Sequence, residues 1–369
     1  MDVSELLAAL EANSQDGTGV EQVVLDLIES GDLEALEAVL AELSQSVRDG
    51  TAADTVVKTL DGIYRRRKDT DAGRLVAFHG GLLAWKIVED PVRAEMLFRG
   101  VTPEGSFEPQ WTEFYRGFYA SRGNWLRLEQ FLGEVGERRE WDAVQVKRVL
   151  AQTAHEYNNP SKELSYWQAV AQADPNDEEA ERELQRLYTQ LERWPSLADL
   201  FKDRLKRFED AEVEAKVEIL RGMLRIYAEK MKAEPKVLAT YQQILDIDPT
   251  NLEAIDALLS RYEKAGRWPD YVKVLARKIE AVEDPDEQIA LMEVQANLME
   301  TRFANVIEAL KAYERIHELA PGRADVVEKL KDLYEKRRDY DSLIRLRRSE
   351  AEQMTDPDVL KLRPYLMYK

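Results

Sequence analysis

The chain has 369 residues and carries 52 lysines and arginines against 71 aspartates and glutamates, a net charge of −19, with no cysteine. The missing cysteines exclude disulfide bonds, thiol catalysis and thiolate-bound metals, and the negative charge disfavours sequence-independent binding to nucleic acid. A hydrophobic content of 44% is enough for a folded structure, while only 17 glycines and 13 prolines disfavour a turn-rich all-β protein.

The N-terminal segment 1–61 is the most acidic part of the chain, with fourteen acidic side chains against Arg48 and Lys58. Solvated helix faces are the simpler interpretation, and an electrostatic docking surface is the alternative. The N-terminus has neither the basic nor the apolar segment of a secretory signal, and no run approaches about 18 apolar residues. We therefore expect no transmembrane helix and a cytoplasmic location.

Helical spacing continues through residues 51–100, where 55–67 and 74–88 are predicted helices without a clear repeat register. The run from Arg65 to Lys68 is the densest basic segment. A solvated helix end, which the helix dipole favours, is the simpler interpretation, and binding to acidic protein, lipid or nucleic acid is the alternative. We assign residues 1–104 to an acidic N-terminal helical region with degenerate repeats.

The helix that follows is the richest in aromatic residues, with five rings in nine positions. Rings so closely spaced on a helix cannot all face one core, so some are expected in a groove or an interface, although core filling explains most of them. Tyrosine and tryptophan at such a place are typical binding hot spots. Three of the five, Trp111, Tyr115 and Tyr119, are therefore secondary candidates for partner binding; the others are Phe114 and Phe118.

Internal repeats determine the predicted fold. Three segments align without gaps over almost thirty residues from Pro175, Pro249 and Pro321, which lie 74 and 72 residues apart. Aromatic residues recur at the same spacings, which chance does not produce. The recurring sets are Tyr188, Tyr262 and Tyr334; Trp194, Trp268 and Tyr340; and Trp167, Tyr241 and Tyr313.

Each of these repeats has the pattern of two antiparallel helix pairs. Residues 213–230 and 236–247 form one predicted pair, and residues 251–265 and 269–283 form the next. A pair has an apolar face that it cannot bury alone, so neighbouring pairs must stack. The predicted fold class is therefore all-α, a solenoid of antiparallel helix pairs over residues 105–353 with no β-sheet.

These residues also resemble a known family, the 34-residue tetratricopeptide repeat (TPR), whose second helix ends in an apolar–aromatic pattern and a proline. Residues 241–249, YQQILDIDP, followed by Ile255, Leu258 and Tyr262, are similar to that pattern. The longer alternate units and the aromatic residue at the turn within a pair are similar to half-TPR repeats. The resemblance implies a right-handed superhelical array that acts as a binding scaffold.

The repeat spacing predicts that the chain ends inside a further repeat. Asp356-Pro357 lies 72 residues after Asp284-Pro285, and the unit that begins there runs only to Lys369. Residues 354–369 are therefore predicted to be the start of an incomplete repeat that leaves an apolar face uncovered. Two hypotheses follow: the chain is the repeat region of a larger multidomain protein, or this end docks a partner or another copy in a self-assembling structural protein.

The sequence contains no motif for catalysis. The three histidines, His79, His155 and His317, stand in no HExxH frame, and there is neither a phosphate-binding glycine loop nor a GxSxG serine motif. We predict that the protein is not an enzyme and has no catalytic, cofactor-binding or metal-binding residues, and no cofactor. A structural or solvated role is the simpler interpretation of His155, which remains a secondary candidate for lining a groove.

A partner-binding surface is predicted instead. In TPR-like arrays the first helices of successive pairs line the concave face, which places Arg182 and Arg186 on one such helix and Arg221 and Arg225 on the next. The members of each pair are four residues apart and share one helix face. Four arginines in one groove would bind the carboxylates of an acidic peptide. The alternative is that they pair with neighbouring glutamates.

The function predicted from the sequence is a non-catalytic protein–protein interaction scaffold. Its partner is another protein, contributing a peptide or a helix to the concave groove, and an acidic one if the arginine site forms. Self-association through the C-terminal end is the alternative. Neither nucleic acid nor membrane insertion is expected.

Overall fold

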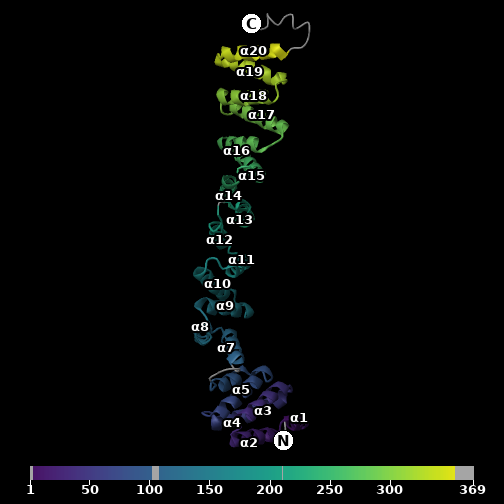
Figure 1. Cartoon of the computed structure of the whole chain (residues 1–369), viewed down its shortest axis with the longest axis vertical. Helices are drawn as coiled ribbons and strands as arrows, with labels where there is room; N and C mark the ends of the chain where they lie inside the picture. Colours follow the sequence, from purple (N-terminus) through teal and green to yellow (C-terminus); the bar gives the residue numbers. More distant parts are fainter. Residues whose placement is uncertain (1–2, 102–107, 210, 354–369) are drawn as a thin grey trace. The chain divides into compact units, whose positions relative to one another are not determined.

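A computed structural model describes residues 3–101, 108–209 and 211–353 (Figure 1). They belong to two compact units, Met1–Leu187 and Tyr188–Lys369, and each unit is described by itself. Helices joined by short turns account for nearly all of these residues, and no strand occurs among them. The predicted all-α fold class is confirmed for the part of the chain that the structure describes.

The first unit holds the helices α1 to α10 and most of α11. Their bounds are α1 Val3–Ala12, α2 Thr18–Ser30, α3 Leu33–Ser46, α4 Gly50–Arg67, α5 Asp71–Lys86, α6 Pro91–Phe98, α7 Glu108–Ser121, α8 Trp125–Arg138, α9 Ala143–Glu156, α10 Pro160–Ala173 and α11 Glu178–Gln190. Helix α3 packs against α1, α2 and α5, and α4 packs against α2 and α5, so the first helices form a bundle rather than a simple stack.

The second unit begins within α11 and continues to the C-terminus. Its helices are α12 Trp194–Leu205, α13 Val213–Arg225 with a π-helical turn η2 Ile226–Lys230, α14 Glu234–Ile247, α15 Leu252–Lys264, α16 Trp268–Ala281, α17 Pro285–Thr301, α18 Val306–Leu319, α19 Ala324–Arg337 and α20 Tyr340–Gln353. Each helix from α12 onward packs on the next one in the chain. The helix pairs predicted for residues 213–283 are confirmed.

Polar caps explain where many of the helices begin. Asp142 forms a capping box with Gln145: its carboxylate accepts the Gln145 N–H at 2.7 Å, and the Gln145 amide oxygen accepts the Asp142 N–H at 2.9 Å. Asn124 and Asn159 accept a backbone N–H in the same way at the starts of α8 and α10. The caps satisfy donors that a helix end leaves unpaired, so these short polar residues set the helix boundaries.

A recurring turn joins the two helices of each pair from α7 onward. One residue of the turn has a left-handed backbone, and the residue after it stands at the start of the second helix. The N–H of that next residue closes the first helix, as when Arg267 donates to the Tyr262 carbonyl at 2.8 Å. The left-handed residues are Gly123, Asn158, Glu192, Lys232, Gly266, Ala304 and Arg338.

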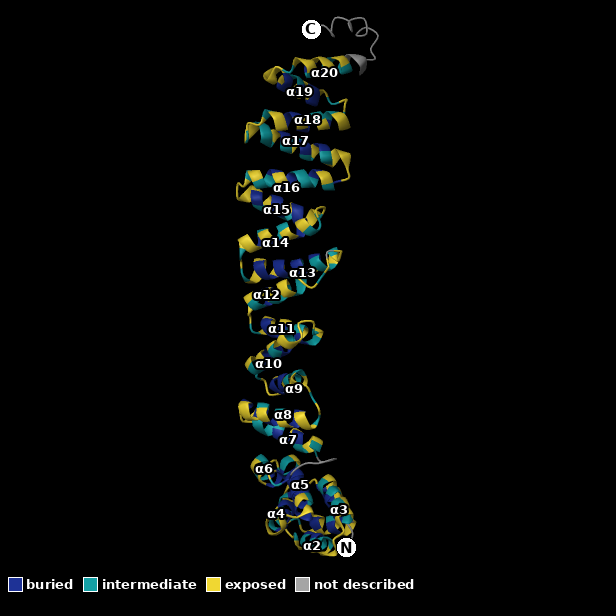
Figure 2. Cartoon of the chain, turned by 60° about the vertical axis from the view of Figure 1, so that its left-hand side comes forward, coloured by how far each residue is buried: buried dark blue, intermediate teal, exposed yellow. Residues whose placement is uncertain are grey.

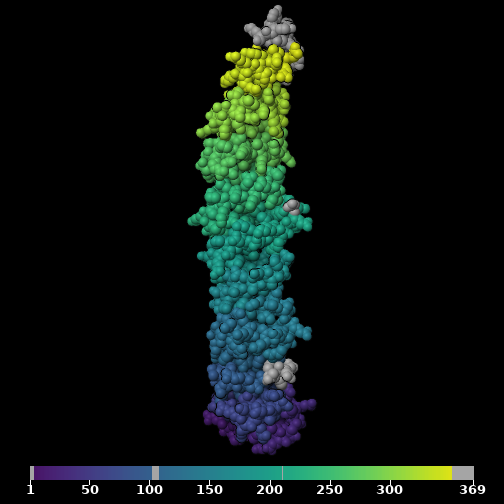
Figure 3. Space-filling view, turned by 90° about the vertical axis from the view of Figure 1, so that its left-hand side faces the viewer, coloured from purple at the N-terminus to yellow at the C-terminus, as the bar shows by residue number. Residues whose placement is uncertain are grey.

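Five of the nine repeating aromatic residues lie in the cores of their own units, whereas Tyr340 is exposed and Trp194, Tyr241 and Trp268 are half-buried. Trp167 is buried in the first unit, and Tyr262, Tyr313 and Tyr334 are buried in the second. Buried faces alternate with exposed ones along the helices (Figure 2). Within each unit the surface colours of the space-filling view follow the order of the sequence (Figure 3), and from α12 onward each helix packs on the next. This nearest-neighbour burial is what stacked repeats require.

The helix pairs have two lengths. In the first unit the pairs that begin at Glu108 and Ala143 start 35 residues apart, and in the second unit the pairs that begin at Val213, Leu252, Pro285 and Ala324 start 39, 33 and 39 residues apart. The shorter intervals are close to the period of about 34 residues that is typical of TPR helix pairs, and the longer ones are the longer alternate units seen in the sequence. The sense of the superhelix and the division of the chain into 1–104, 105–353 and 354–369 stay predictions. The segments 102–107 and 354–369, where both divisions fall, lie outside the described residues.

Candidate functional site

The histidines do not form a shared site. His79 is buried in α5, where its Nδ1 lies 3.2 Å from the Ser44 hydroxyl of α3, and burial lowers its pKa to about 4. His155 is on α9 and His317 is on α18. Among the described residues no group of three or more His, Asp or Glu side chains could hold a metal ion. In the same part of the chain, no helix is long and apolar enough to cross a membrane.

Two adjoining pockets open along α7, α9 and α11, the first helices of their pairs in unit 1. The α7–α9 pocket encloses about 300 Å³ and the α9–α11 pocket about 480 Å³, and Glu156 lines both. We call the two together the first-helix groove. The α7–α9 pocket is lined by Trp85, Pro91, Glu113, Phe114, Arg116, Gly117, Phe118, Ser121, Glu156 and Tyr157. The α9–α11 pocket is lined by Ala151, Gln152, His155, Glu156, Glu163, Trp167, Glu179, Glu183 and Arg186.

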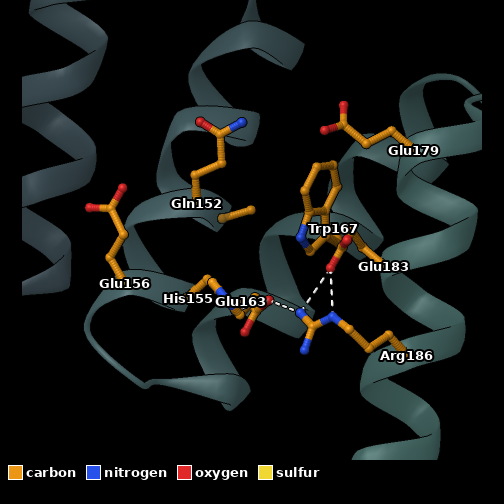
Figure 4. Close-up of a pocket in the computed structure, with 9 residues that line it drawn as sticks. Gln152, His155, Glu156, Glu163, Trp167, Glu179, Glu183 and Arg186 are labelled. Carbon is orange, nitrogen blue, oxygen red and sulfur yellow. Dashed lines mark hydrogen bonds and ion pairs between the residues drawn. The ribbon is translucent and has the colours of Figure 1, made fainter.

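The α9–α11 pocket has two charged walls and an aromatic floor. Gln152, His155 and Glu156 come from α9 on one side, and Glu179, Glu183 and Arg186 come from α11 on the other (Figure 4). Glu163 and Trp167 of α10 lie between the walls, and both are almost fully buried. This spacing follows from the helix period, because residues 163 and 167 lie one turn apart on the inner face of α10.

Glu163 is the central charged group of this pocket. Its residue is 3% exposed, and its Oε1 accepts from the Arg186 guanidinium and lies 3.1 Å from Nδ1 of His155. A buried carboxylate without such partners would be costly. Its other oxygen, Oε2, has no hydrogen-bond partner within the described residues. Glu163 therefore keeps one carboxylate oxygen whose hydrogen bonds the described residues do not supply.

Ion pairs connect the first helices across the groove. Arg116 of α7 pairs with Glu156 of α9 at 3.0 Å, and Arg148 of α9 pairs with Glu179 and Asp177 at the start of α11. In the second unit Arg221 of α13 makes the same kind of connection to Glu253 of α15 at 2.9 Å. These pairs hold neighbouring repeats in register and occupy the arginine side chains that take part.

A third pocket of unit 1, the α6–α8 pocket, is lined by α6, α7 and α8 and encloses about 480 Å³. It brings together Trp111, Tyr115 and Tyr119, and the rings of Tyr115 and Tyr119 stack with their centroids 5.6 Å apart. Tyr115 is only 5% exposed, and burial raises the pKa of its phenol. The full lining is Glu95, Phe98, Arg99, Trp111, Tyr115, Tyr119, Arg127, Phe131 and Glu134.

The aromatic cluster of α7 is divided between two pockets. Trp111, Tyr115 and Tyr119, four residues apart, line the α6–α8 pocket, whereas Phe114 and Phe118 line the α7–α9 pocket. The division follows from the helix period, because residues at i and i+4 share a face and residues at i+3 and i+7 occupy the adjacent one. Phe114 contacts Tyr115 and Phe118 and is itself buried.

The four candidate arginines differ in their surroundings. Arg186 pairs with Glu163 and with Glu183, the latter at 2.8 Å, while Arg182 is exposed and its Nε donates to the Glu178 carbonyl at 3.3 Å. In the second unit Arg221 pairs with Glu253 and, at 3.6 Å, with Glu218. Arg225 is exposed. The pairing with neighbouring glutamates that the sequence offered as an alternative is present for Arg186 and Arg221.

Of the sequence candidates, His155 and Arg186 line the same pocket, and both contact Glu163. Sequence reasoning missed Glu163 and Trp167 as pocket residues, and it missed Tyr157 at the rim of the α7–α9 pocket. A usable signal was present: Glu163 occupies a core-facing position one helical turn before Trp167, and an acidic residue at such a position is rarely buried without a reason.

The fold and the groove define a class of protein, a TPR-like all-α array of helix pairs. This description rests on the pairs themselves, on their stacking and on their intervals of 33 to 39 residues. No family model matches the sequence, and no curated protein matches it.

Solved structures give several matches. The chain is similar to the "MamA RS-1 ArsTM double mutant", with 15% identity, a TM-score of 0.24 and coverage of 50% of this chain and 98% of that one. It is similar to TTC0263, a thermophilic TPR protein in Thermus thermophilus, with 16% identity, a TM-score of 0.20 and coverage of 52% and 98%. A third match is the P58(IPK) TPR domain, with 14% identity, a TM-score of 0.21 and coverage of 92% and 93%.

Proposed function

We propose that this protein is a non-catalytic scaffold that binds a segment of another protein in the first-helix groove of unit 1. Stacked helix pairs form a surface that is ordered before the partner arrives, so binding costs the scaffold little conformational entropy. The observation that carries the proposal is the pair of adjoining pockets joined at Glu156. Pockets in a row along successive repeats suit consecutive side chains of one partner segment.

The ion pairs of the groove support this proposal. They connect α9 to α11 through Arg148 and α11 to α10 through Arg186, and a fixed site loses less entropy on binding than a mobile one. The α7–α9 pocket offers aromatic surface from Phe118 and Tyr157, which suits an apolar side chain. A segment that uses both pockets would therefore combine one apolar and one polar anchor.

The two arginine pairs, Arg182 with Arg186 in the first unit and Arg221 with Arg225 in the second, remain a second proposal for where an acidic partner would bind. Arg182 and Arg225 are the members that are exposed, whereas Arg186 and Arg221 already hold carboxylates. A carboxylate of a partner would have to displace those pairs. The first-helix groove therefore has the stronger support.

The experiment that tests the proposed function uses a phage-displayed library of random twelve-residue peptides, selected on the immobilised full chain. Enriched peptides are then measured by fluorescence anisotropy against the unaltered protein, Gln152→Trp and Gln172→Trp. Gln152 is exposed at the α9–α11 pocket, whereas Gln172 is exposed on α10 away from its lining. We expect Gln152→Trp to fill the pocket and abolish binding, and Gln172→Trp to bind normally.

Two outcomes would overturn the proposed function. One is a selection that enriches no peptide above the background of an uncoated surface. The other is a set of peptides that bind Gln152→Trp as tightly as the unaltered protein, because those peptides would use a different surface. Circular dichroism of both tryptophan variants checks that they keep the helical fold.

A further inference from the structure

We infer that the α9–α11 pocket binds a lysine or arginine side chain of the partner, and that the partner segment is therefore basic at this point. The inference rests on the proposed function and adds the chemistry of the partner. It differs in sign from the acidic peptide that the four arginines suggest.

Charge is the first argument. The lining of the α9–α11 pocket contains four glutamates, Glu156, Glu163, Glu179 and Glu183, against one arginine, Arg186, and the exposed His155. The α7–α9 pocket adds Glu113 against Arg116. Arg148 and Asp177 pair at the edge of the groove. With these two residues included, the groove contains six carboxylates and three guanidinium groups. The ion pairs that bridge the helices therefore leave an excess of negative charge in the groove.

The second argument is independent of this count and concerns Glu163. Its carboxylate is buried in the lining of the pocket, and Oε2 has no hydrogen-bond partner within the described residues. A carboxylate accepts several hydrogen bonds, and its two contacts both go to Oε1. An incoming ammonium or guanidinium group would supply the donors that Oε2 is missing, and a partner carboxylate would be repelled.

The shape of the pocket agrees with a long cationic side chain. Trp167 and the buried Ala151 form the apolar part of the lining, while the carboxylate of Glu156 is exposed and that of Glu183 is half-buried. Lysine and arginine have an apolar stem that packs on such surface and a charged head that reaches a carboxylate. A volume of about 480 Å³ accommodates one such side chain together with the backbone that carries it.

The neighbouring pocket gives the partner a second feature. Phe114, Phe118 and Tyr157 line the α7–α9 pocket, and a Cβ atom added at Gly117 would lie 2.5 Å from the Tyr157 hydroxyl. The absence of a side chain at Gly117 thus lets Tyr157 close on α7. We expect an apolar residue of the partner here, a few positions from the basic one.

The peptides selected above also test this inference. We expect them to share a lysine or arginine together with an apolar residue at a constant spacing. Replacing the basic residue of a selected peptide by alanine should raise its Kd about tenfold, as expected for a hydrogen-bonded charge in a partly buried site. Raising the salt concentration should weaken binding of the basic peptide more than that of its alanine version.

Matched variants of the protein test which carboxylates bind the basic side chain of the peptide. The test variant is Glu156→Gln with Glu183→Gln, and the control is Glu137→Gln with Glu178→Gln. The control removes the same charge from exposed positions outside the groove on α8 and α11. We expect the test variant to raise the Kd of the basic peptide about tenfold and the control to change it less than twofold. Glu163 is left intact because its loss would disturb the fold.

The outcomes separate the two proposals. If selected peptides bind in the groove but are acidic or lack a shared basic residue, the inference about charge is wrong and the scaffold function stands. An equal loss of affinity in the test variant and the control would also overturn it, because the effect would then be one of net charge. If no peptide is selected, the proposed function itself fails, and the inference fails with it.

Discussion

The guanidinium of Arg302 lies over the ring of Trp268, 4.9 Å from its centroid. Lys230 has the same relationship to Trp194, at 5.1 Å. In both cases the aromatic residue begins the second helix of one pair, and the cation follows the first helix of the next pair. The aromatic residue that recurs at this turn in the sequence therefore links neighbouring repeats through a cation–π contact.

A double-mutant cycle on this contact should show coupling. We expect Trp268→Leu and Arg302→Met each to lower the free energy of unfolding of the second unit. The double variant should lose about 0.5–1 kcal/mol less than the sum of the single losses. Urea denaturation followed by circular dichroism measures all four proteins. Additive losses would show that the contact contributes no energy of its own.

Substitutions at the left-handed residue of the turn should change the stability of the second unit in opposite directions. Gly266 and Ala304 occupy the same position of successive turns, with φ angles of 65° and 49°. Because a Cβ atom disfavours this backbone region, Ala304→Gly should stabilise the second unit by about 1 kcal/mol, and Gly266→Ala should destabilise it by about the same amount. Urea midpoints measured under one condition test both changes. A shift of both midpoints in the same direction would contradict the explanation.

These turns also show what could be predicted from the sequence and what could not. The period of the apolar residues predicted the helices, and the spacing of residues such as Tyr188 and Tyr262 predicted the helix pairs, because burial requires both patterns. Most of the left-handed residues are not glycine. Glu192 and Lys232 adopt this backbone because packing of the helix pair imposes it, and no local signal marks them.

The candidate site shows a similar division. The sequence singled out Trp111, Tyr115 and Tyr119 among five closely spaced rings, and the structure brings these three into one pocket. Which glutamate faces Arg186 depends on the packing of α10 against α11, because Glu163 lies 23 residues earlier in the chain. In a chain with 71 acidic residues, the sequence offers many partners for each arginine. The packing of the helices determines which of these acidic residues each arginine contacts.

The buried His79 should make the first unit sensitive to acid. Burial lowers its pKa from 6.5 to about 4, so the unfolded chain takes up a proton at a pH at which the folded unit does not. The stability that the neutral ring provides is therefore complete above pH 6.5 and is lost as the pH falls toward 4. At pH 5 the loss should be about 2 kcal/mol.

The measurement compares His79→Leu with the unaltered protein at pH 7.5 and pH 5, by urea denaturation. Acidic side chains contribute the same pH dependence to both proteins, so the difference between the proteins isolates His79. We expect the variant to gain stability relative to the unaltered protein as the pH falls. A difference that is the same at both pH values would show that His79 is accessible to protons in the folded unit.

Arg186 and Arg182 share one face of α11 but should differ in their effect on stability. Arg186→Met would leave the buried carboxylate of Glu163 with His155 as its one remaining contact, which should cost on the order of 2 kcal/mol. Arg182 is exposed and bonds only its own helix, so Arg182→Met should change the stability by less than about 0.5 kcal/mol. Adding Glu163→Gln to Arg186→Met should recover part of the loss, because it removes the buried charge. Urea midpoints of the three variants test this prediction. If Arg186→Met lowers the stability as little as Arg182→Met does, the ion pair with Glu163 contributes little, and Arg186 could exchange Glu163 for a partner's carboxylate. That result would support the proposal of an acidic partner.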